Sequence, residues 1–436
     1  MSNKLQPVRG THDILPQEYG GDFEKFHYVV ETARDLATLY GFREMATPIF
    51  EQTEVFSRSM GETSDVVSKE MFTFETRGGE SVTLRPEFTA GIARAFISNG
   101  MQQHLPLKLF STGPLFRYER PQKGRQRQFH QVNFEWLGDD SWMADVEVIE
   151  LAGRFLQSIS AIEDSCTLHI NTLGDVKSRE RYRDALVSFL TPFAEKLSED
   201  SKRRLAENPL RILDSKDKGD RDILINAPVM TNYLSDVAKK RFDKVCNYLS
   251  KLEFFNSIKV DPALVRGLDY YTDIVFEFVA TSGDLGAQNT VLAGGRYDGL
   301  IEQMGGKPTP AIGFAAGVER LSLLTGNKKE EKSLNITVIP FEEVDPEIVL
   351  DLVGGLRAGL YNNLRKTIMS VDIDWQGKLS KRLEKAAKNG ATHVVIISPD
   401  EMKDGMVIVK NMETRNEQKI SISGLSIEKL KEIFGI

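Results

Sequence analysis

Hydrophobic and polar residues alternate in FHQVNFEW, residues 129–136, with the period of two that is typical of a β-strand. A second alternating segment ends near Phe116, so the pattern predicts a β-hairpin over Phe116–Glu135. One face of the second arm is more apolar and suits a core, whereas the other is polar and suits a ligand. The apolar face holds His130, Val132, Phe134 and Trp136, and the polar face holds Phe129, Gln131, Asn133 and Glu135.

Other segments follow the helical period of 3.6 residues or form short extended runs. The segment FREMATPIF, residues 42–50, is predicted to be extended, and Gly78 and Gly79 are predicted to join two short strands in a turn. These strands are predicted over Phe72–Phe74 and Ser81–Arg85, and helices over Asp22–Tyr40, from Pro86 to Gly100 and over Trp142–Ser158.

The pattern changes near Gly174. Asp175–Leu252 is rich in charge and in helical periodicity, and strand character returns in Leu264–Val279 and Val291–Gly295. The sequence therefore predicts a sheet-based domain formed by residues 1–174 and 259–325, which a helical insertion at 175–258 interrupts.

A charged linker, Thr325–Lys332, precedes a region in which strands and helices alternate. That order predicts an α/β domain over residues 333–436 with a largely parallel sheet. Its predicted strands are Ile336–Pro340, Thr367–Ile373, His393–Ser398 and Met406–Lys410, and its predicted helices are Pro346–Leu364, Lys378–Lys388 and Ser426–Phe434.

Composition narrows the class of protein. With 436 residues, 41% hydrophobic and 27% charged, the chain is long enough for two or three globular domains. No run approaches 18 apolar residues and the start lacks the apolar core of a signal peptide, so we expect a cytoplasmic protein without membrane segments. The net charge of −7 argues against generic coating of nucleic acid but not against local recognition. Cys166 and Cys246 are expected to be free thiols.

The tip of the hairpin holds five basic residues between Arg117 and Arg127, with Glu119 as the only acid. Arginine suits phosphate because its planar guanidinium offers paired donors and stays charged. A solvated, charged hairpin tip is the alternative interpretation. If the hairpin binds a ligand, Phe129 could stack on a flat ring and Glu135 could hold a cationic group.

Three more segments carry polar or glycine-rich patterns. TLRPEFT, residues 83–89, places Thr83, Arg85 and Glu87 on one strand parity, and LVRGLDYYTDIVFEF, residues 264–278, joins Arg266 to paired tyrosines. In AGGRYDGL and AIGFAAGVERL, residues 293–300 and 311–321, small residues permit close backbone approach. No P-loop, dinucleotide-binding GxGxxG after a strand, or GxSxG elbow is present.

Taken together, these segments resemble the histidyl-tRNA synthetase family of class II, essentially from end to end. FREMATPIFEQ, the FRYER…RQFHQ…E hairpin and GFAAGVERL resemble motifs 1, 2 and 3, and RGLDYYTDIVFEF and AGGRYDGL resemble the two histidine-specific segments. The resemblance implies an α+β catalytic domain with a six-stranded antiparallel sheet, a helical insertion, a C-terminal anticodon-binding domain and a homodimer. It also implies ligation of L-histidine to tRNA(His) through a histidyl-adenylate made from ATP, with Mg²⁺ arriving on ATP.

The resemblance also implies roles for single residues. The expected catalytic residues are Arg266, Arg117 and Gln131. Histidine would be bound by Glu87, Phe88, Thr89, Arg117, Gln131, Glu135, Arg266, Tyr270, Tyr271 and Tyr297. ATP would be bound by Arg117, Glu119, Arg125, Phe129 and Arg320. The tRNA would be contacted by Gln122, Arg127, Lys378, Lys381 and Arg382.

The chain departs from the family at three positions, where Phe88, Asn133 and Asp273 replace small residues. Two other classes of function remain to be weighed. A regulatory paralogue that senses histidine without aminoacylation typically lacks RGLDYY and the C-terminal domain, and this chain has both. An RNA-binding protein on an inactive scaffold would not need every charged catalytic position, and here all are filled.

Overall fold

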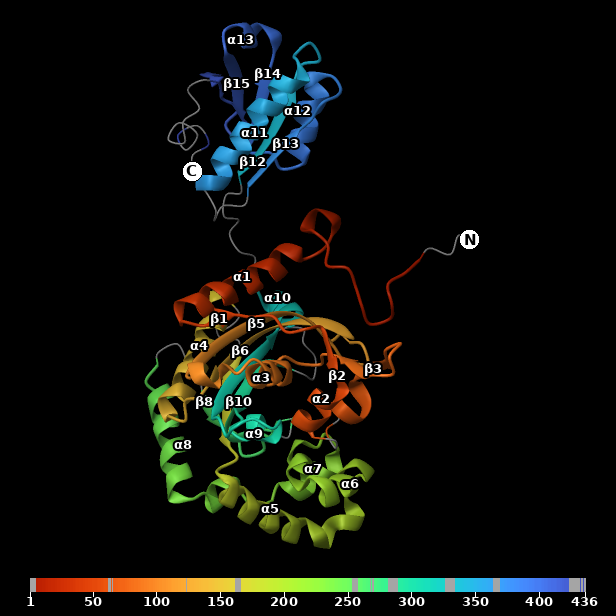
Figure 1. Ribbon diagram of the computed structural model, residues 1–436, viewed down its shortest axis with the longest axis vertical. Coiled ribbons are helices and arrows are strands. Elements are labelled where there is room, and N and C mark those ends of the chain that lie inside the picture. Colours follow the sequence, from red (N-terminus) through yellow and green to blue (C-terminus); the bar gives the residue numbers. More distant parts are fainter. Residues whose placement is uncertain are drawn as a thin grey trace. The chain divides into compact units, whose positions relative to one another are not determined.

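A mixed eight-stranded sheet organises the first part of the molecule (Figure 1). The structure, a computed structural model, describes residues 5–61, 64, 66–122, 124–160, 166–252, 258–266, 268, 270–280, 289–325, 334–363, 369–422, 432 and 434. Its contacts divide the chain into two units, residues 1–326 and 327–436, and the division falls within the charged segment 325–332. The predicted helix Ser426–Phe434 lies outside the described residues, except for residues 432 and 434. Gly267 and Asp269 of the RGLDYY segment also lie outside them.

The sheet corrects the expected six-stranded antiparallel arrangement. Its six inner strands pair antiparallel, but β1 pairs parallel with β5, and β8 pairs parallel with β7, at the two edges. These edge strands span only two and three residues, which is too short for a periodic signal. In spatial order the strands are β1 (Arg43–Glu44), β5 (Leu107–Phe116), β6 (Gln128–Leu137), β11 (Ala311–Gly317), β10 (Thr290–Arg296), β9 (Thr272–Ala280), β7 (Cys166–Thr172) and β8 (Ile258–Val260).

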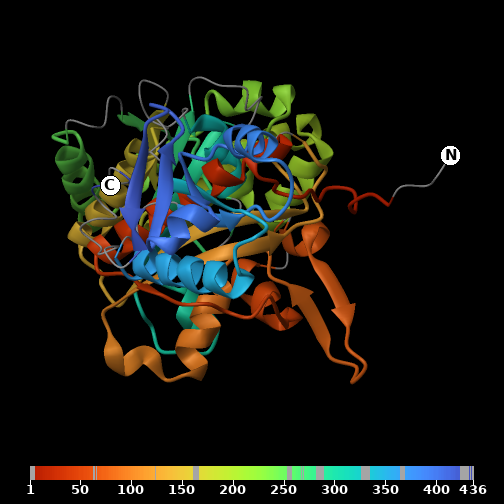
Figure 2. The same ribbon diagram turned by 90° about the horizontal axis from the view of Figure 1, so that it is seen from above.

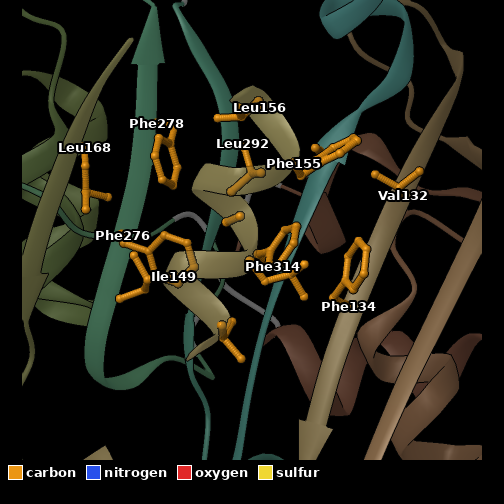
Figure 3. Packing of buried hydrophobic residues seen from close by; sticks show 14 of the residues in the cluster. Val132, Phe134, Ile149, Phe155, Leu156, Leu168, Phe276, Phe278, Leu292 and Phe314 are labelled. Atoms are coloured by element: carbon orange, nitrogen blue, oxygen red, sulfur yellow. The ribbon is translucent and has the colours of Figure 1, made fainter. Parts of the chain in front are cut away.

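The predicted hairpin is present: β5 and β6 pair antiparallel, with Phe116 opposite Gln128. Val132, Phe134 and Trp136 of β6 lie in the main hydrophobic core with side chains of β9, β10 and β11. Helix α4 (Trp142–Ser158), whose predicted bounds are confirmed, lies across this face of the sheet (Figure 3). Helices α1 (Phe23–Leu39) and α10 (Val318–Leu324) contribute to the same core.

Residues 175–252 contain helices and no strand, as the charge and periodicity predicted. Tyr182, Leu186, Ile212 and Met230 form a separate small core within this region. Helix α8 instead packs on α4, with Phe242, Val245 and Leu249 in the main core. The α-helices are α5 (Val176–Leu190), α6 (Glu199–Glu207), α7 (Lys218–Leu224) and α8 (Asp236–Leu249), joined by 3₁₀ turns at Thr191–Lys196, Pro209–Asp214 and Met230–Tyr233.

A smaller sheet, β2-β4-β3, lies beside the large one, and its β3–β4 hairpin projects outward (Figure 2). Next to it, α2, α3 and α9 form a second core with Phe56, Phe96 and Leu300. The elements are β2 (Phe50–Gln52), β3 (Phe72–Glu75), β4 (Ser81–Leu84), α2 (Thr53–Met60), α3 (Thr89–Ser98) and α9 (Leu300–Gln303). Short 3₁₀-helices occur at Gln17–Tyr19 and Met101–His104, and a short π-helix at Val66–Glu70.

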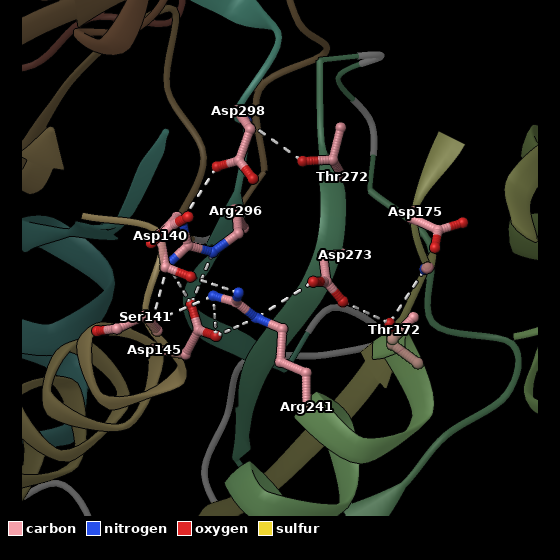
Figure 4. A network of polar contacts seen from close by, with 12 residues as sticks. Asp140, Ser141, Asp145, Thr172, Asp175, Arg241, Thr272, Asp273, Arg296 and Asp298 are labelled. Atoms are coloured by element: carbon pink, nitrogen blue, oxygen red, sulfur yellow. Dashed lines mark hydrogen bonds and ion pairs between the residues drawn. The ribbon is translucent and has the colours of Figure 1, made fainter. Parts of the chain in front are cut away.

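Buried charges join α4, α8 and the start of β9 (Figure 4). Asp145 and Arg296 have fully buried side chains and approach to 2.6 Å, and Arg241 of α8 approaches the second oxygen of Asp145, also at 2.6 Å. Burial raises the pKa of Asp145 to about 6, so the carboxylate is ionised at neutral pH. Arg296 also pairs with Asp298 at 3.0 Å, which fixes the residues on both sides of Tyr297.

The second unit has a five-stranded sheet of order β13-β12-β14-β15-β16. β12 pairs parallel with β13 and β14, but β14–β15 and β15–β16 are antiparallel, so the prediction of a largely parallel sheet holds for one half. The connection 398–405 is shorter than a parallel crossover requires. The elements are β12 (Leu334–Pro340), α11 (Pro346–Asn363), β13 (Met369–Ile373), α12 (Leu379–Lys388), β14 (His393–Ile397), α13 (Pro399–Lys403), β15 (Met406–Asn411) and β16 (Glu417–Ser421). None of the described helices is long and apolar enough to cross a membrane.

We predict that Arg296→Leu lowers the free energy of unfolding of the full chain by about 3–5 kcal/mol, because it leaves the buried Asp145 carboxylate without its fully buried partner. Urea-induced unfolding measures this loss. The control is Arg58→Leu, which removes an exposed ion pair to Glu54 and should cost about 0–1 kcal/mol. Equal costs for the two variants would contradict the prediction.

Candidate active site

A cavity of about 880 Å³ lies on the face of the large sheet that carries the odd-numbered residues of β6. This is the polar face that the alternation predicted, and the even-numbered residues from Val132 to Trp136 pack into the core behind it. Every residue that the sequence assigned to histidine or ATP lines this cavity. These residues come from the segment before α3, from the β5–β6 hairpin, from the loop before β9, from the end of β10 and from α10.

The Glu135 carboxylate is the most enclosed polar group of the site, with 1% of the residue exposed. It accepts hydrogen bonds from the hydroxyls of Thr89 and Tyr297 and from the Asn133 amide, the last at 3.1 Å. Burial raises the pKa of Glu135 to about 7, although these three hydrogen bonds act in the opposite direction. A buried carboxylate that has neutral hydrogen-bond donors but no positively charged partner among the described residues suits a cationic group on a ligand.

Gly313 of β11 makes room for this carboxylate. It lies directly opposite Glu135 in the antiparallel pairing of β6 and β11. A Cβ at residue 313 would lie 1.8 Å from Glu135 Oε2 and 2.4 Å from the Phe134 carbonyl oxygen. Any side chain here would therefore displace Glu135. The sequence indicated close backbone approach in this segment, but not the group that required it.

Glu87 and Thr89 connect the cavity to the start of α3. The Glu87 carboxylate accepts hydrogen bonds from the backbone N–H groups of Thr89 and Ala90, each at 2.6 Å. Acidic groups are favoured at helix N-termini, and this cap explains why α3 begins at Thr89 rather than at Pro86. Burial raises the pKa of Glu87, with the helix N–H groups opposing that change.

Three tyrosines form an aromatic wall next to Glu135. The ring centroids of Tyr270 and Tyr271 are 4.8 Å apart, and those of Tyr270 and Tyr297 are 5.5 Å apart. All three residues are buried. Burial raises the pKa of each phenol, so the hydroxyls remain neutral hydrogen-bonding groups at neutral pH.

Arginines gather in another part of the same cavity. Arg125 pairs with Glu119 at 2.7 Å, and the Arg117 guanidinium lies 5.5 Å from the centroid of Phe129 and donates to the Pro86 carbonyl at 3.0 Å. Burial, together with the positive charges of Arg125 and Arg117, lowers the pKa of Arg320 to about 10. Arg320 is still charged at neutral pH, and Arg117, Arg125 and Arg320 outnumber Glu119, the acid that pairs with this cluster, which suits a polyanion.

Arg266 lies in the loop before β9 and pairs with Glu277. Its guanidinium is 5.8 Å from the centroid of Tyr271. The Arg266 Nε atom is buried and has no hydrogen-bond partner among the described residues. The expected cationic arginine is therefore in the cavity, and one of its donors is unpaired among the described residues. Glu277 was missed by the sequence analysis, although it is the only acid in the otherwise apolar strand DIVFEFVA after Asp273.

The residues assigned to tRNA lie in different settings. Gln122 and Arg125 form a β-bridge at the hairpin tip, and Arg127 lies 3.8 Å from the Tyr118 ring centroid and is bonded by its backbone N–H to the Gly10 carbonyl at 2.6 Å. In the second unit Lys378 and Lys381 are exposed.

Arg382 corrects the expectation of an RNA contact, because the residue is only 4% exposed. It donates to the Pro340 carbonyl at 2.8 Å and to the Asp374 carbonyl. Arg382 therefore joins α12 to the sheet instead of facing solvent. The helical spacing to the buried Ala386, four residues on, was a signal that could have revealed this.

The three departures from the family pattern have structural partners. Phe88 is buried, and the Arg85 guanidinium lies 4.6 Å from its ring centroid. The Asn133 amide donates to Glu135 and, at 3.4 Å, to the Phe314 carbonyl. Asp273 has a positive φ of 47°, accepts from the Thr172 hydroxyl at 3.0 Å and pairs with Arg241 at 3.2 Å. Asn133 thus supports the site, whereas Asp273 joins α8 to the start of β9.

Comparison with known proteins agrees with this geometry. A family model for histidyl-tRNA synthetase matches residues 10–321, and a model for an anticodon binding domain matches residues 335–433. The histidine–tRNA ligase of Rhodospirillum rubrum is 48% identical over 97% of this chain and 97% of its own length. That of Rickettsia bellii is 46% identical over 99% of this chain and 100% of its own length. The apo histidyl-tRNA synthetase structure from S. aureus matches with a TM-score of 0.78 and 32% identity, over 98% of this chain and 100% of that one.

The fold and the cavity define a class II aminoacyl-tRNA synthetase, with a catalytic and an anticodon-binding domain. Within that class, the chain belongs to the histidyl-tRNA synthetase family. The resemblance of its motifs is thereby confirmed.

We predict that Gly313→Ala raises the KM for histidine about 10- to 100-fold, because the new methyl group displaces the Glu135 carboxylate. Steady-state ATP–pyrophosphate exchange at varied histidine measures this change. Gly299→Ala is the matched control, since a Cβ there meets nothing within 4 Å and its φ of −87° suits alanine. A histidine KM within twofold of the wild type in Gly313→Ala would contradict the assignment.

Proposed function

We propose that this cavity joins L-histidine to ATP and then transfers the histidyl group to the 3′ end of tRNA(His). The observation that carries the proposal is the pairing, within one cavity, of a buried carboxylate set in tyrosines with a cluster of arginines beside a phenylalanine. The first end suits the charged and aromatic parts of histidine, and the second suits a nucleoside triphosphate.

The histidine end would recognise its ligand by complementary polar groups. Glu135 offers a carboxylate to a cationic nitrogen, and the tyrosines offer neutral hydroxyls and ring faces. An apolar side chain of similar size would leave these buried groups unpaired, which is the costly way to bind the wrong amino acid. We assign histidine binding to Glu87, Phe88, Thr89, Arg117, Gln131, Glu135, Arg266, Tyr270, Tyr271 and Tyr297.

ATP would occupy the arginine-rich end, with Arg117, Glu119, Arg125 and Arg320 around its phosphates and adenine and with Phe129 stacked on the adenine ring. Among the described residues, no three His, Cys, Asp or Glu side chains form a group that could hold a metal ion. Mg²⁺ would arrive bound to the phosphates of ATP.

In the first step a carboxylate oxygen of histidine attacks the α-phosphorus of ATP, the bond to the bridging oxygen breaks, and pyrophosphate leaves. Negative charge grows on the α-phosphate oxygens, and fixed guanidinium groups of Arg266 and Arg117 would stabilise it without reorganising. The attacking carboxylate is already an anion, so no base is needed, and Gln131 would help to position it. In the second step a 3′-terminal hydroxyl of tRNA loses its proton and attacks the acyl carbon, the bond from that carbon to the phosphate oxygen breaks, and AMP leaves as an anion.

For the tRNA we propose two contact regions. Gln122 and Arg127 at the β5–β6 hairpin would approach the acceptor end. Residues 333–436 would bind the anticodon, with Lys378 and Lys381 facing phosphates and the partly exposed Trp375 stacking on a base. We assign catalysis to residues 1–174 and 259–325, with 175–258 as the insertion, and we propose a cytoplasmic homodimer.

A regulatory paralogue is not favoured. The relatives that match almost the whole chain at 46–48% identity are named histidine–tRNA ligases. The solved structure titled as an ATP phosphoribosyltransferase regulatory subunit/histidyl-tRNA synthetase is 20% identical, and that similarity indicates the fold alone.

We predict that Arg266→Ala lowers the rate of histidine-dependent ATP–pyrophosphate exchange at least about 10³-fold, because it removes a cation from the α-phosphate. Thermal unfolding should change little, since the Arg266 side chain is partly exposed in the cavity. Near-normal exchange in this variant would refute the assignment.

We also predict that Lys378→Glu and Lys381→Glu each weaken tRNA binding about five- to tenfold at moderate salt, and leave histidine activation unchanged. Filter binding of tRNA(His) and pyrophosphate exchange measure the two effects. Lys403→Glu, which reverses an exposed lysine on α13, is the control. Loss of activation with unchanged tRNA binding would reject this division of roles.

A further inference from the structure

Glu277 lines the cavity, and none of the proposed roles explains this residue. It lies on β9 between Phe276 and Phe278, which enter the main core, and its own side chain lines the cavity. Its carboxylate pairs with Arg266 Nη1 through one oxygen and accepts the Thr290 hydroxyl at 2.8 Å through the other. A carboxylate with both oxygens engaged has a fixed orientation, and it fixes in turn the groups that donate to it.

Arg266 is held at two points, its guanidinium and its backbone carbonyl. Glu277 takes one of its terminal nitrogens, and Arg211 of the insertion donates to the Arg266 backbone carbonyl at 2.9 Å. Nε remains buried and has no partner among the residues that the structure describes. Because a guanidinium is rigid and planar, an acid on Nη1 determines where its remaining N–H donors point.

The same carboxylate is linked to the arginine of α10. The Thr290 backbone carbonyl accepts a hydrogen bond from Arg320 Nη1, while the hydroxyl of the same residue donates to Glu277. Glu277 thus contacts Arg266 directly and reaches Arg320 through one residue of β10. Arg266 and Arg320 come from segments far apart in the sequence, and the contacts of Glu277 connect the two side chains.

The neighbouring charged groups do not replace this interaction. His169 of β7 lies opposite Glu277 in the β7–β9 pairing, and its ring nitrogen is paired with Asp261 at 2.9 Å. Asp261 is in turn within 3.6 Å of Lys259. On the other side, the residue of β10 opposite Glu277 is Ala293. Arg266 is therefore the cation that pairs with Glu277 among the described residues.

We propose that Glu277 is a positioning residue for adenylate formation. Its carboxylate orients Arg266 so that the free N–H donors of the guanidinium face the α-phosphate, and its bond to Thr290 keeps Arg320 in register with them. This proposal rests on the proposed function, in which Arg266 acts at the α-phosphate. Glu277 itself touches neither substrate in this role.

The test is single-turnover formation of histidyl-adenylate at saturating ATP and histidine, in four full-length forms: wild type, Glu277→Gln, Arg266→Ala and the double variant. Glu277→Gln keeps the shape and the Thr290 acceptor but loses the charge that orients Arg266. We expect it to lower the rate constant about 10- to 100-fold in the wild-type background. In the Arg266→Ala background it should cause no further loss, or a gain, because an unpaired carboxylate next to the phosphates is repulsive.

A purely structural role predicts a different result, namely the same loss in both backgrounds, and that result would overturn the proposal. A rate constant within twofold of the wild type for Glu277→Gln alone would also overturn it. Glu302→Gln, the same substitution at an exposed position of α9, is the control and should leave the rate constant unchanged. If Arg266→Ala alone retains near-normal rates, the proposed function fails instead, so the two failures are distinguishable.

Discussion

The two-residue period of a β-strand is the constraint on which this molecule depends. On β6, successive side chains enter either the core beneath α4 or the cavity on the opposite face, so each residue serves one or the other. Strands β11 and β9 of the same sheet repeat the division, with Phe314 and Phe276 in the core and Gly313 and Glu277 lining the cavity. The aromatic packing thereby holds the floor of a polar site rigid. A shift of one residue in the register of β6 would exchange its two faces, and this would disrupt both the hydrophobic core and the polar site.

Charges buried near that floor are tolerated because each has a specific partner. Asp145 is enclosed by Arg296 and Arg241, and Glu135 by hydroxyl and amide donors. The two environments have different outcomes: guanidinium partners keep Asp145 ionised at neutral pH, whereas Glu135 has a pKa of about 7 without its ligand. The first arrangement stabilises the fold. The second leaves a buried carboxylate without a positively charged partner in the described part of the chain, and a cationic substrate can supply that charge.

Much of this could be predicted from the sequence, since strong periodicity and family motifs are local signals. The parity of β6 and the bounds of α4 followed from them, and so did the placement in one cavity of the residues assigned to histidine and ATP. The edge strands β1 and β8 were not predicted, because two or three residues are too few to show a period. The antiparallel half of the second sheet was not predicted either, because strand direction depends on the length of the connection. Arg382 and Glu277 were missed or misplaced for another reason: a charged residue has the same identity whether it faces solvent or a buried partner, and only tertiary contacts distinguish the two.

The order of strands in the large sheet has a consequence for synthesis on the ribosome. β6 pairs with β11, and the segment between them includes the whole helical insertion, so the sheet remains open until nearly three quarters of the chain has emerged. During that interval Asp145 lacks Arg296, its partner 151 residues later, and the aromatic face of β6 lacks the core side chains of β9, β10 and β11. Long-range pairing of this kind slows folding and leaves apolar surface exposed to aggregation. Until β11 has been made, the unfinished first unit is therefore exposed to aggregation, which a chaperone that covers apolar surface would prevent.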